Sequence, residues 1–175
     1  MNIAAFDLSL TATGFATYGP LFNGNEKSAG IIDPKKLSGM MRLRFIRDAV
    51  LELSCLTEIV VLEGYAFGVA RQSGLREIGE LGGVVRMGLW ERGTRYVEIP
   101  PASLKLFATG RGNAKKEEVL VSAVRHLDYD GHDHNVADAL WLLQMALARS
   151  GDIEPTNEHQ RRALEKIVWP ELAGV

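Results

Sequence analysis

Residues 58–62, with the sequence EIVVL, restrict the fold of this chain more than any other segment. After its first residue the run is apolar and rich in β-branched residues, which is typical of a strand covered on both faces. A sheet with both faces covered needs a layer of helices on each side. The run ends on an acid, Glu63, which Gly64 follows. The segment therefore predicts an α/β fold in which a carboxylate stands at the end of a buried strand.

Hydrophobic periodicity and turn residues divide the rest of the chain into strands and helices. Four further segments are predicted to be strands: 2–6, 14–18, 27–32 and 94–99. Apolar residues at helical spacing predict five helices: 38–53, 71–90, 102–107, 116–127 and 134–149. Three strands joined by tight turns, followed by alternating helices and strands, predict a five-stranded mixed sheet flanked by helices, with its first three strands antiparallel. We expect residues 1–150 to form one domain and residues 151–175 to extend it.

Composition limits the classes of protein to which the chain can belong. The 175 residues, 46% of them hydrophobic, are enough to bury one substantial core. The net charge of −2 gives no general affinity for polyanions, so any contact with nucleic acid must come from a local basic patch. The one cysteine, Cys55, excludes an internal disulfide and a multi-cysteine zinc site, and we expect it to be buried. No signal pattern and no apolar run of membrane-spanning length is present, which predicts a cytoplasmic protein without a membrane partner.

Acids follow two of the predicted strands at the point where each strand ends. Asp7 follows the first strand, and Glu63 follows the strand over 58–62. If these strands are neighbours, about 5 Å apart, their carboxylates converge at one edge of the sheet. Asp138, near the start of the last strongly apolar helix, is the third candidate. Carboxylates in a polar crevice suit Mg²⁺ or Mn²⁺, and two such ions can hydrolyse a phosphodiester by activating water and stabilising the leaving 3′ oxygen.

Each acid also has a purely structural interpretation. A lone Asp after a strand is usually a turn or capping residue, and the hydroxyls of Ser9, Thr11 and Thr13 could serve the same turn. Asp133 or Asp138 could act only as an acid at a helix N-terminus. The order of the three acids on these particular elements favours the metal site.

Four motifs of the chain resemble the RuvC family of Holliday junction resolvases, which has the ribonuclease H-like superfold. They are GYAFG after Glu63, LGGVVRMGLWERG, PPASLKLFATGRGNAKKEEV and HNVADALWLL, and the resemblance covers residues 2 to about 147. It implies a ribonuclease H-like fold and a nuclease that cuts branched DNA with Mg²⁺ and without a nucleotide cofactor. Together with the carboxylate chemistry above, this predicts Mg²⁺ (or Mn²⁺) as cofactor, with two ions in each site. The resemblance also implies a homodimer in which each subunit nicks one of two opposed strands of a four-way junction.

At the acids, the resemblance implies that Asp7, Glu63 and Asp138 bind metal and are catalytic. The chain departs from the family pattern three residues before Asp138, where family members commonly have Asp or His and this chain has Asn135. A neutral amide oxygen can bind a hard cation but contributes less charge. His134 could take this place as a ligand or as a general base, or it could face solvent at the start of the helix.

Basic and aromatic residues indicate a DNA-binding surface. The resemblance puts Phe67 near an aromatic that unstacks bases at the junction centre, and Lys105, Lys115 and Lys116 near lysines that contact phosphates. Phe67 lies among glycines, which favours an exposed aromatic that wedges between bases, although it could also belong to the core. Basic residues concentrate in two segments that the fold would bring toward the acids: Arg71, Arg76, Lys105, Arg111, Lys115 and Lys116. A charge run is usually a solvated face, but this position favours a DNA cradle.

Two function classes agree with these observations. The first is a structure-selective endodeoxyribonuclease that resolves Holliday junctions or other branched DNA. The alternative is a catalytically weak or silent branched-DNA-binding module of the same fold, for which Asn135 is the only support. Actin-like and sugar-kinase ATPases also place an Asp and a hydroxyl-rich turn after their first strand. They need a second lobe and a further glycine-rich phosphate loop, neither of which this sequence offers.

Overall fold

A computed structural model of the chain describes residues 1–21, 27–64 and 75–171. Two residues predicted to contact DNA, Phe67 and Arg71, lie outside these ranges. The described residues contain five strands: β1 (Ile3–Asp7), β2 (Thr13–Tyr18), β3 (Ser28–Ile32), β4 (Ile59–Glu63) and β5 (Tyr96–Ile99). They also contain six helices: α1 (Gly39–Leu53), α2 (Leu75–Glu91), α3 (Pro101–Thr109), α4 (Lys116–His126), α5 (His134–Ser150) and α6 (Glu158–Glu165).

The strands form one mixed sheet in the order β3-β2-β1-β4-β5. β2 is antiparallel to both of its neighbours, β1 and β3. β4 is parallel to both of its neighbours, β1 and β5. The predicted α/β class, the five-stranded mixed sheet and its three antiparallel strands are thus confirmed. Because β1 and β4 run in the same direction, their last residues, Asp7 and Glu63, lie at the same edge of the sheet.

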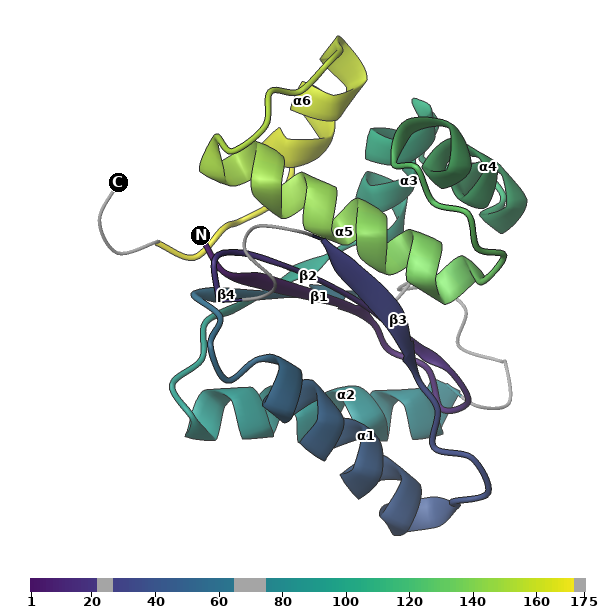
Figure 1. Cartoon of the computed structure of the whole chain (residues 1–175), viewed down its shortest axis with the longest axis vertical. Coiled ribbons are helices and arrows are strands. Elements are labelled where there is room, and N and C mark those ends of the chain that lie inside the picture. The colour runs from purple at the N-terminus through teal and green to yellow at the C-terminus, as the bar shows by residue number, and fades with distance from the viewer. Residues whose placement is uncertain (22–26, 65–74, 172–175) are drawn as a thin grey trace.

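Helices cover both faces of the sheet, as the buried run over 58–62 predicted (Figure 1). On one face α5 packs across β1 and β2, with α3, α4 and α6 in the same layer. On the other face lie α1 and α2, which pack against each other. Alternate strand residues enter the two cores. Ile3 and Val61 pack under α5, whereas Phe6 and Leu62 pack under α1 and α2.

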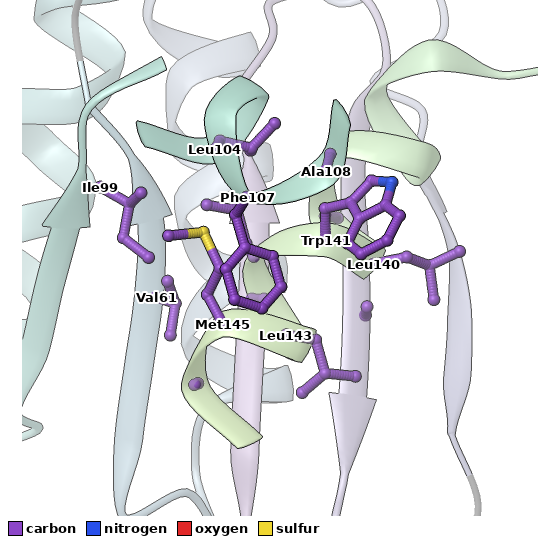
Figure 2. Close-up of a cluster of buried hydrophobic side chains, with 14 of the residues drawn as sticks. Val61, Ile99, Leu104, Phe107, Ala108, Leu140, Trp141, Leu143 and Met145 are labelled. Atoms are coloured by element: carbon purple, nitrogen blue, oxygen red, sulfur yellow. The ribbon is translucent and has the colours of Figure 1, made fainter. Parts of the chain in front are cut away.

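α5 is the central helix of the first of these layers, and 12 of its 17 residues are buried. Its start is fixed by the Asp133 side chain, which accepts hydrogen bonds from the backbone amides of Asn135 (2.8 Å) and Val136 (3.1 Å). Figure 2 shows the ring of Phe107 from α3 beside the Trp141 indole of α5, with their centroids 6.0 Å apart in an edge-to-face arrangement. A helix that is capped and packed in this way holds its second turn in a defined position.

One expectation about the fold is wrong, and one segment had no secondary structure assigned from the sequence. Cys55 is exposed, so its predicted burial is wrong: α1 ends at Leu53 and the chain turns before β4. Beyond residue 151 the chain forms α6, which packs on α3 and contributes Ala163 to the core under α5, where Ile167 also lies. The C-terminal segment therefore helps to hold the helical layer in which α3 and α5 lie.

In the described part of the chain, none of the helices combines the length and the apolar character that crossing a membrane would require.

Candidate metal centre at the sheet edge

Three acids that are far apart in the sequence meet at one edge of the sheet. Asp7 ends β1, Glu63 ends the neighbouring β4, and Asp138 lies on the second turn of α5. One carboxylate oxygen from each of the three lies within 4.8 Å of those of the other two. Such a group of oxygens can share one cation or a close pair of cations. The convergence of Asp7 and Glu63 follows from the parallel pairing of their strands, as the sequence predicted.

Gly14 explains how α5 comes close enough for Asp138 to join the other two acids. It pairs with Asp7 across β1 and β2. A Cβ atom added to Gly14 would lie 2.0 Å from the backbone oxygen of Asn135, which belongs to the first turn of α5. No real side chain fits at that distance, so only glycine allows this approach of helix and strand.

The electrostatics of the cluster favour a bound cation. Asp7 and Asp138 are 6% and 5% exposed. Burial, and then the nearby charge of Glu63, raise the pKa of Asp7 well above its usual range. The same two causes raise the pKa of Asp138 to about 7. Lys116 acts in the opposite direction on both acids without cancelling these effects.

The donor set fits Mg²⁺ or Mn²⁺. All three side chains offer hard carboxylate oxygens, which these ions prefer over nitrogen and sulfur. Removing ionised carboxylates from water costs free energy that a divalent cation can offset. The residues present therefore match the group that the fold family implies.

The acids line a cavity of about 280 Å³ whose wall also carries basic side chains. Two of these, Lys105 on α3 and Lys116 at the start of α4, are among the predicted DNA-binding residues. The third, Arg86 on α2, is paired with Glu98 of β5, and both line the cavity. Sequence reasoning missed Arg86 and Glu98. A signal for Arg86 was available in the helix spacing. Arg86 lies about two turns after Ile78, so the two share one partly buried face of α2, which lines the cavity.

The turn after β1 is held by its hydroxyl residues. The Thr13 hydroxyl accepts a hydrogen bond from the Ser9 amide (3.0 Å) and donates one to the Ser9 carbonyl (2.8 Å). The Ser9 hydroxyl accepts from the amides of Thr11 and Ala12, each at 3.4 Å. These hydroxyl residues therefore stabilise the turn, which was one of the two interpretations of this segment. The carboxylate of Asp7, in contrast, lies close to those of the other two acids.

The two candidates for a further ligand occupy other positions. The Asn135 side-chain amide donates a hydrogen bond to the Ala12 carbonyl (2.6 Å), which ties α5 to the turn after β1. His134 begins α5, and its Nδ1 is buried without a hydrogen-bond partner among the described residues. His134 is not part of the group formed by Asp7, Glu63 and Asp138, and neither His134 nor Asn135 lines the cavity that these acids line. Asp133 caps the helix, which is the role that one interpretation gave it.

Three further basic residues that were predicted to bind DNA, and that lie within the described ranges, are exposed and do not line the cavity. Arg76 on α2 pairs with Glu80 (3.0 Å). Arg111, in the loop after α3, pairs with Glu118 of α4. Lys115 is exposed at the residue before α4. A DNA-binding role for these three residues stays a prediction.

A second and larger cavity, of about 670 Å³, lies among α3, α4, α5 and the segment that leads into α6. Its lining contains Phe107 and Trp141 but none of the residues predicted for catalysis or DNA binding. Size alone would therefore select this cavity, whereas the convergent carboxylates select the smaller one.

Comparison with known proteins adds named relatives to this geometry. The chain is 30% identical over 133 residues to the crossover junction endodeoxyribonuclease RuvC of Parasynechococcus marenigrum, covering 73% of this chain and 84% of that protein. It is 33% identical over 107 residues to the RuvC of Bacteroides fragilis, covering 59% of this chain and 56% of that protein. The chain thus spans little more than half the length of this second relative. No family model matches this chain.

Solved structures agree with the fold. The structure of Thermus thermophilus RuvC superposes with a TM-score of 0.66 at 25% identity, over 86% of this chain and 97% of that one. A structure of T. thermophilus RuvC in complex with a Holliday junction substrate gives a TM-score of 0.65 at 24% identity, over 86% and 96% of the two chains.

Proposed function

The chain belongs to the RuvC family of crossover junction endodeoxyribonucleases, and we propose that it cuts branched DNA at the acid cluster of Asp7, Glu63 and Asp138. The observation that carries this proposal is the convergence of three carboxylate oxygens within 4.8 Å at a cavity that also holds lysines. Four-way junctions are the proposed substrate, since a relative of the same fold is known in complex with one.

The proposed cofactor is Mg²⁺ or Mn²⁺, with two ions in each site. Its proposed ligands are Asp7, Glu63 and Asp138. A divalent ion at such a site supplies Lewis-acid chemistry, because it lowers the pKa of bound water and stabilises negative charge on phosphodiester oxygens. His134 and Asn135 do not line the cavity that holds the acids, and the Asn135 amide donates to the Ala12 carbonyl. We therefore assign the ligand roles to the acids and leave Asn135 the task of holding the turn.

The protein's own residues supply the rest of the site. The carboxylates are held on two strand ends and one capped helix, so they need little rearrangement when a cation and a phosphate bind. Lys105 and Lys116 project positive charge into the same cavity, where they attract the scissile phosphate and offset the repulsion between it and the acids. Water is the nucleophile in this proposal, and hydrolysis leaves a nick in the strand.

We further propose that the enzyme acts as a homodimer in which each subunit cuts one of two opposed strands. Two large apolar side chains of α2, Met87 and Trp90, are 56% and 72% exposed, which agrees with a surface that a second copy covers. Sedimentation of the purified protein at micromolar concentration tests this. A monomer that nicks only one strand of each junction would contradict it.

The direct test is a nicking assay on a synthetic four-way junction with Mg²⁺ or Mn²⁺. We expect cleavage by the parent protein, and none by Asp7→Asn or Glu63→Gln. Linear duplex of the same sequence is the control for structure selectivity. Tight binding of the junction without cleavage under either ion would instead support the silent DNA-binding module. Equal cleavage of linear duplex would indicate a less selective nuclease.

A further inference from the structure

Arg86 and Glu98 form an ion pair in the wall of the catalytic cavity, and the family resemblance assigns no role to either residue. Arg86 Nη1 lies 2.7 Å from Glu98 Oε1, and the two side chains are 27% and 40% exposed. Arg86 is thus partly buried and Glu98 is exposed, and the pair borders the space that also contains Asp7, Glu63 and Asp138.

Arg86 reaches the cavity from a different layer of the protein than the two lysines do. It lies on α2, which covers one face of the sheet, whereas Lys105 and Lys116 lie on α3 and α4, which cover the other (Figure 1). The acids lie between these layers, at the ends of β1 and β4. A DNA strand that crosses this edge would thus meet positive charge on both sides of its scissile phosphate.

The described lining of the cavity carries more acidic than basic side chains, so the positive charge of Arg86 is important for any DNA that binds there. Within the described lining, four carboxylates (Asp7, Glu63, Glu98 and Asp138) face three cationic side chains (Arg86, Lys105 and Lys116). A phosphodiester chain entering this space is repelled by the acids, so each cation counts in holding it. The planar guanidinium suits the task because it presents several N–H donors in a fork that matches two phosphate oxygens.

We propose that Arg86, held in place by Glu98, binds a backbone phosphate of the cleaved strand that neighbours the scissile one. This inference rests on the proposed nuclease function. Arg86 is then a residue that contacts substrate, and Glu98 is a positioning residue that acts through it. Because the ion pair already restricts the long arginine side chain, less conformational entropy remains to be lost when the phosphate binds.

The test compares Arg86→Gln and Arg86→Lys with the parent and with Arg44→Gln. Arg44 is a fair control because it also pairs with an acid one helical turn away, Asp48 at 3.4 Å, but is highly exposed on α1 and outside the cavity. Junction affinity is measured over a salt series with each substitution placed in an Asp7→Asn background, which prevents cleavage. KM and kcat are measured with the Asp7 residue intact, and thermal unfolding is followed for all proteins.

We expect Arg86→Gln to weaken junction binding about tenfold and to lower the slope of log Kd against log salt by roughly 0.7 to 0.9, the value for one lost phosphate contact. KM should rise with the loss of affinity, and kcat should change by less than about threefold, because the contact is made to a phosphate that does not react. Arg86→Lys should recover the salt slope but only part of the affinity, since it keeps the charge and loses the fork. Arg44→Gln should match the parent in junction affinity and in the salt slope.

Two outcomes would overturn the inference while leaving the nuclease assignment intact. In the first outcome, Arg86→Gln leaves both the cleavage kinetics and the slope of log Kd against log salt unchanged. The other is a lowered melting temperature for both Arg86 variants without loss of affinity, which would make the pair only a link between α2 and β5. Failure of the parent itself to cut a junction would instead count against the proposed function.

Discussion

Gly14 of β2 lies directly against the backbone of Asn135 in the first turn of α5, at a separation that leaves no room for a Cβ atom. Gly14 is also the strand partner of Asp7. One backbone contact thus fixes the helix that carries Asp138 over the strand pair that carries Asp7. The candidate metal centre thus depends on a residue that has no side chain.

We expect Gly14→Ala to destabilise the protein by about 3 kcal/mol or more, because the methyl group would lie 2.0 Å from the Asn135 oxygen and must displace the helix. Activity should be lost with the alignment of the acids. Gly83→Ala is the matched control, since a Cβ atom at that helical position meets nothing within 4 Å. That substitution should stabilise the protein by about 0.4 to 1 kcal/mol. Urea unfolding of the two variants measures both effects, and equal stabilities would contradict the proposed contact.

Metal binding should become stronger as pH rises from 5 to 8. The pKa of Asp138 is raised to about 7 in the metal-free protein, so the folded state holds a proton that the unfolded chain has released by about pH 4. The free energy of unfolding of the metal-free protein should therefore fall as pH rises from about 4 to about 7. A bound cation removes this loss, because it neutralises the ionised carboxylates. The rise in melting temperature caused by Mn²⁺ should thus be larger at pH 8 than at pH 5, and an equal rise at both would contradict the raised pKa.

Asp138→Asn should abolish cleavage and yet stabilise the metal-free protein at pH 8. The substitution removes a charge that burial and Glu63 both disfavour. The expected gain is at most about 4 kcal/mol, because the pKa of Asp138 rises from 3.8 to about 7 and each pH unit of that rise corresponds to about 1.4 kcal/mol. The exposed Asp130→Asn is the control and should leave stability and cleavage unchanged. Loss of stability in Asp138→Asn would mean that the carboxylate is satisfied by the protein without a cation.

Lys116→Gln should move the pH at which Mn²⁺ binds half-maximally to a higher value. Lys116 lowers the pKa of both Asp7 and Asp138, so its loss raises both. Lys115→Gln is the neighbouring control, because Lys115 does not line the cavity and does not shift either acid. Calorimetric titration with Mn²⁺ between pH 5 and pH 8 compares the variants. An unchanged midpoint in Lys116→Gln would place this lysine too far from the acids to matter.

Asn135→Asp would restore an acid at the position where the family commonly has Asp or His, but we expect it to weaken the fold. The Asn135 amide donates to the Ala12 carbonyl at 2.6 Å, and a carboxylate cannot donate that bond. The cost should be about 1 to 3 kcal/mol, as for other buried groups left without a partner. Asn113→Asp, in the exposed loop before α4, should have little effect. Chemical denaturation decides between this structural role and a ligand role, which would instead raise metal affinity without loss of stability.

The pattern of apolar runs determined most of the fold. Five strands, the alternation of helices with the later strands and the layers on both faces follow from local hydrophobic periodicity, which depends only on neighbouring residues. Parallel pairing of β1 and β4 then requires that Asp7 and Glu63 share an edge. The sequence predicted this shared edge on the condition that the two strands are neighbours, and the sheet order meets that condition.

The tertiary structure decided what local patterns do not encode. Asp138 reaches the other acids only because α5 crosses β2 at Gly14, a contact between segments more than 100 residues apart. The position of Arg86 in the same cavity depends on how α2 packs against β5, and the exposure of Cys55 depends on where α1 ends. Each of these results from long-range packing, in which side-chain volume and backbone approach are matched across the core, and a single sequence read segment by segment carries no direct signal of that matching.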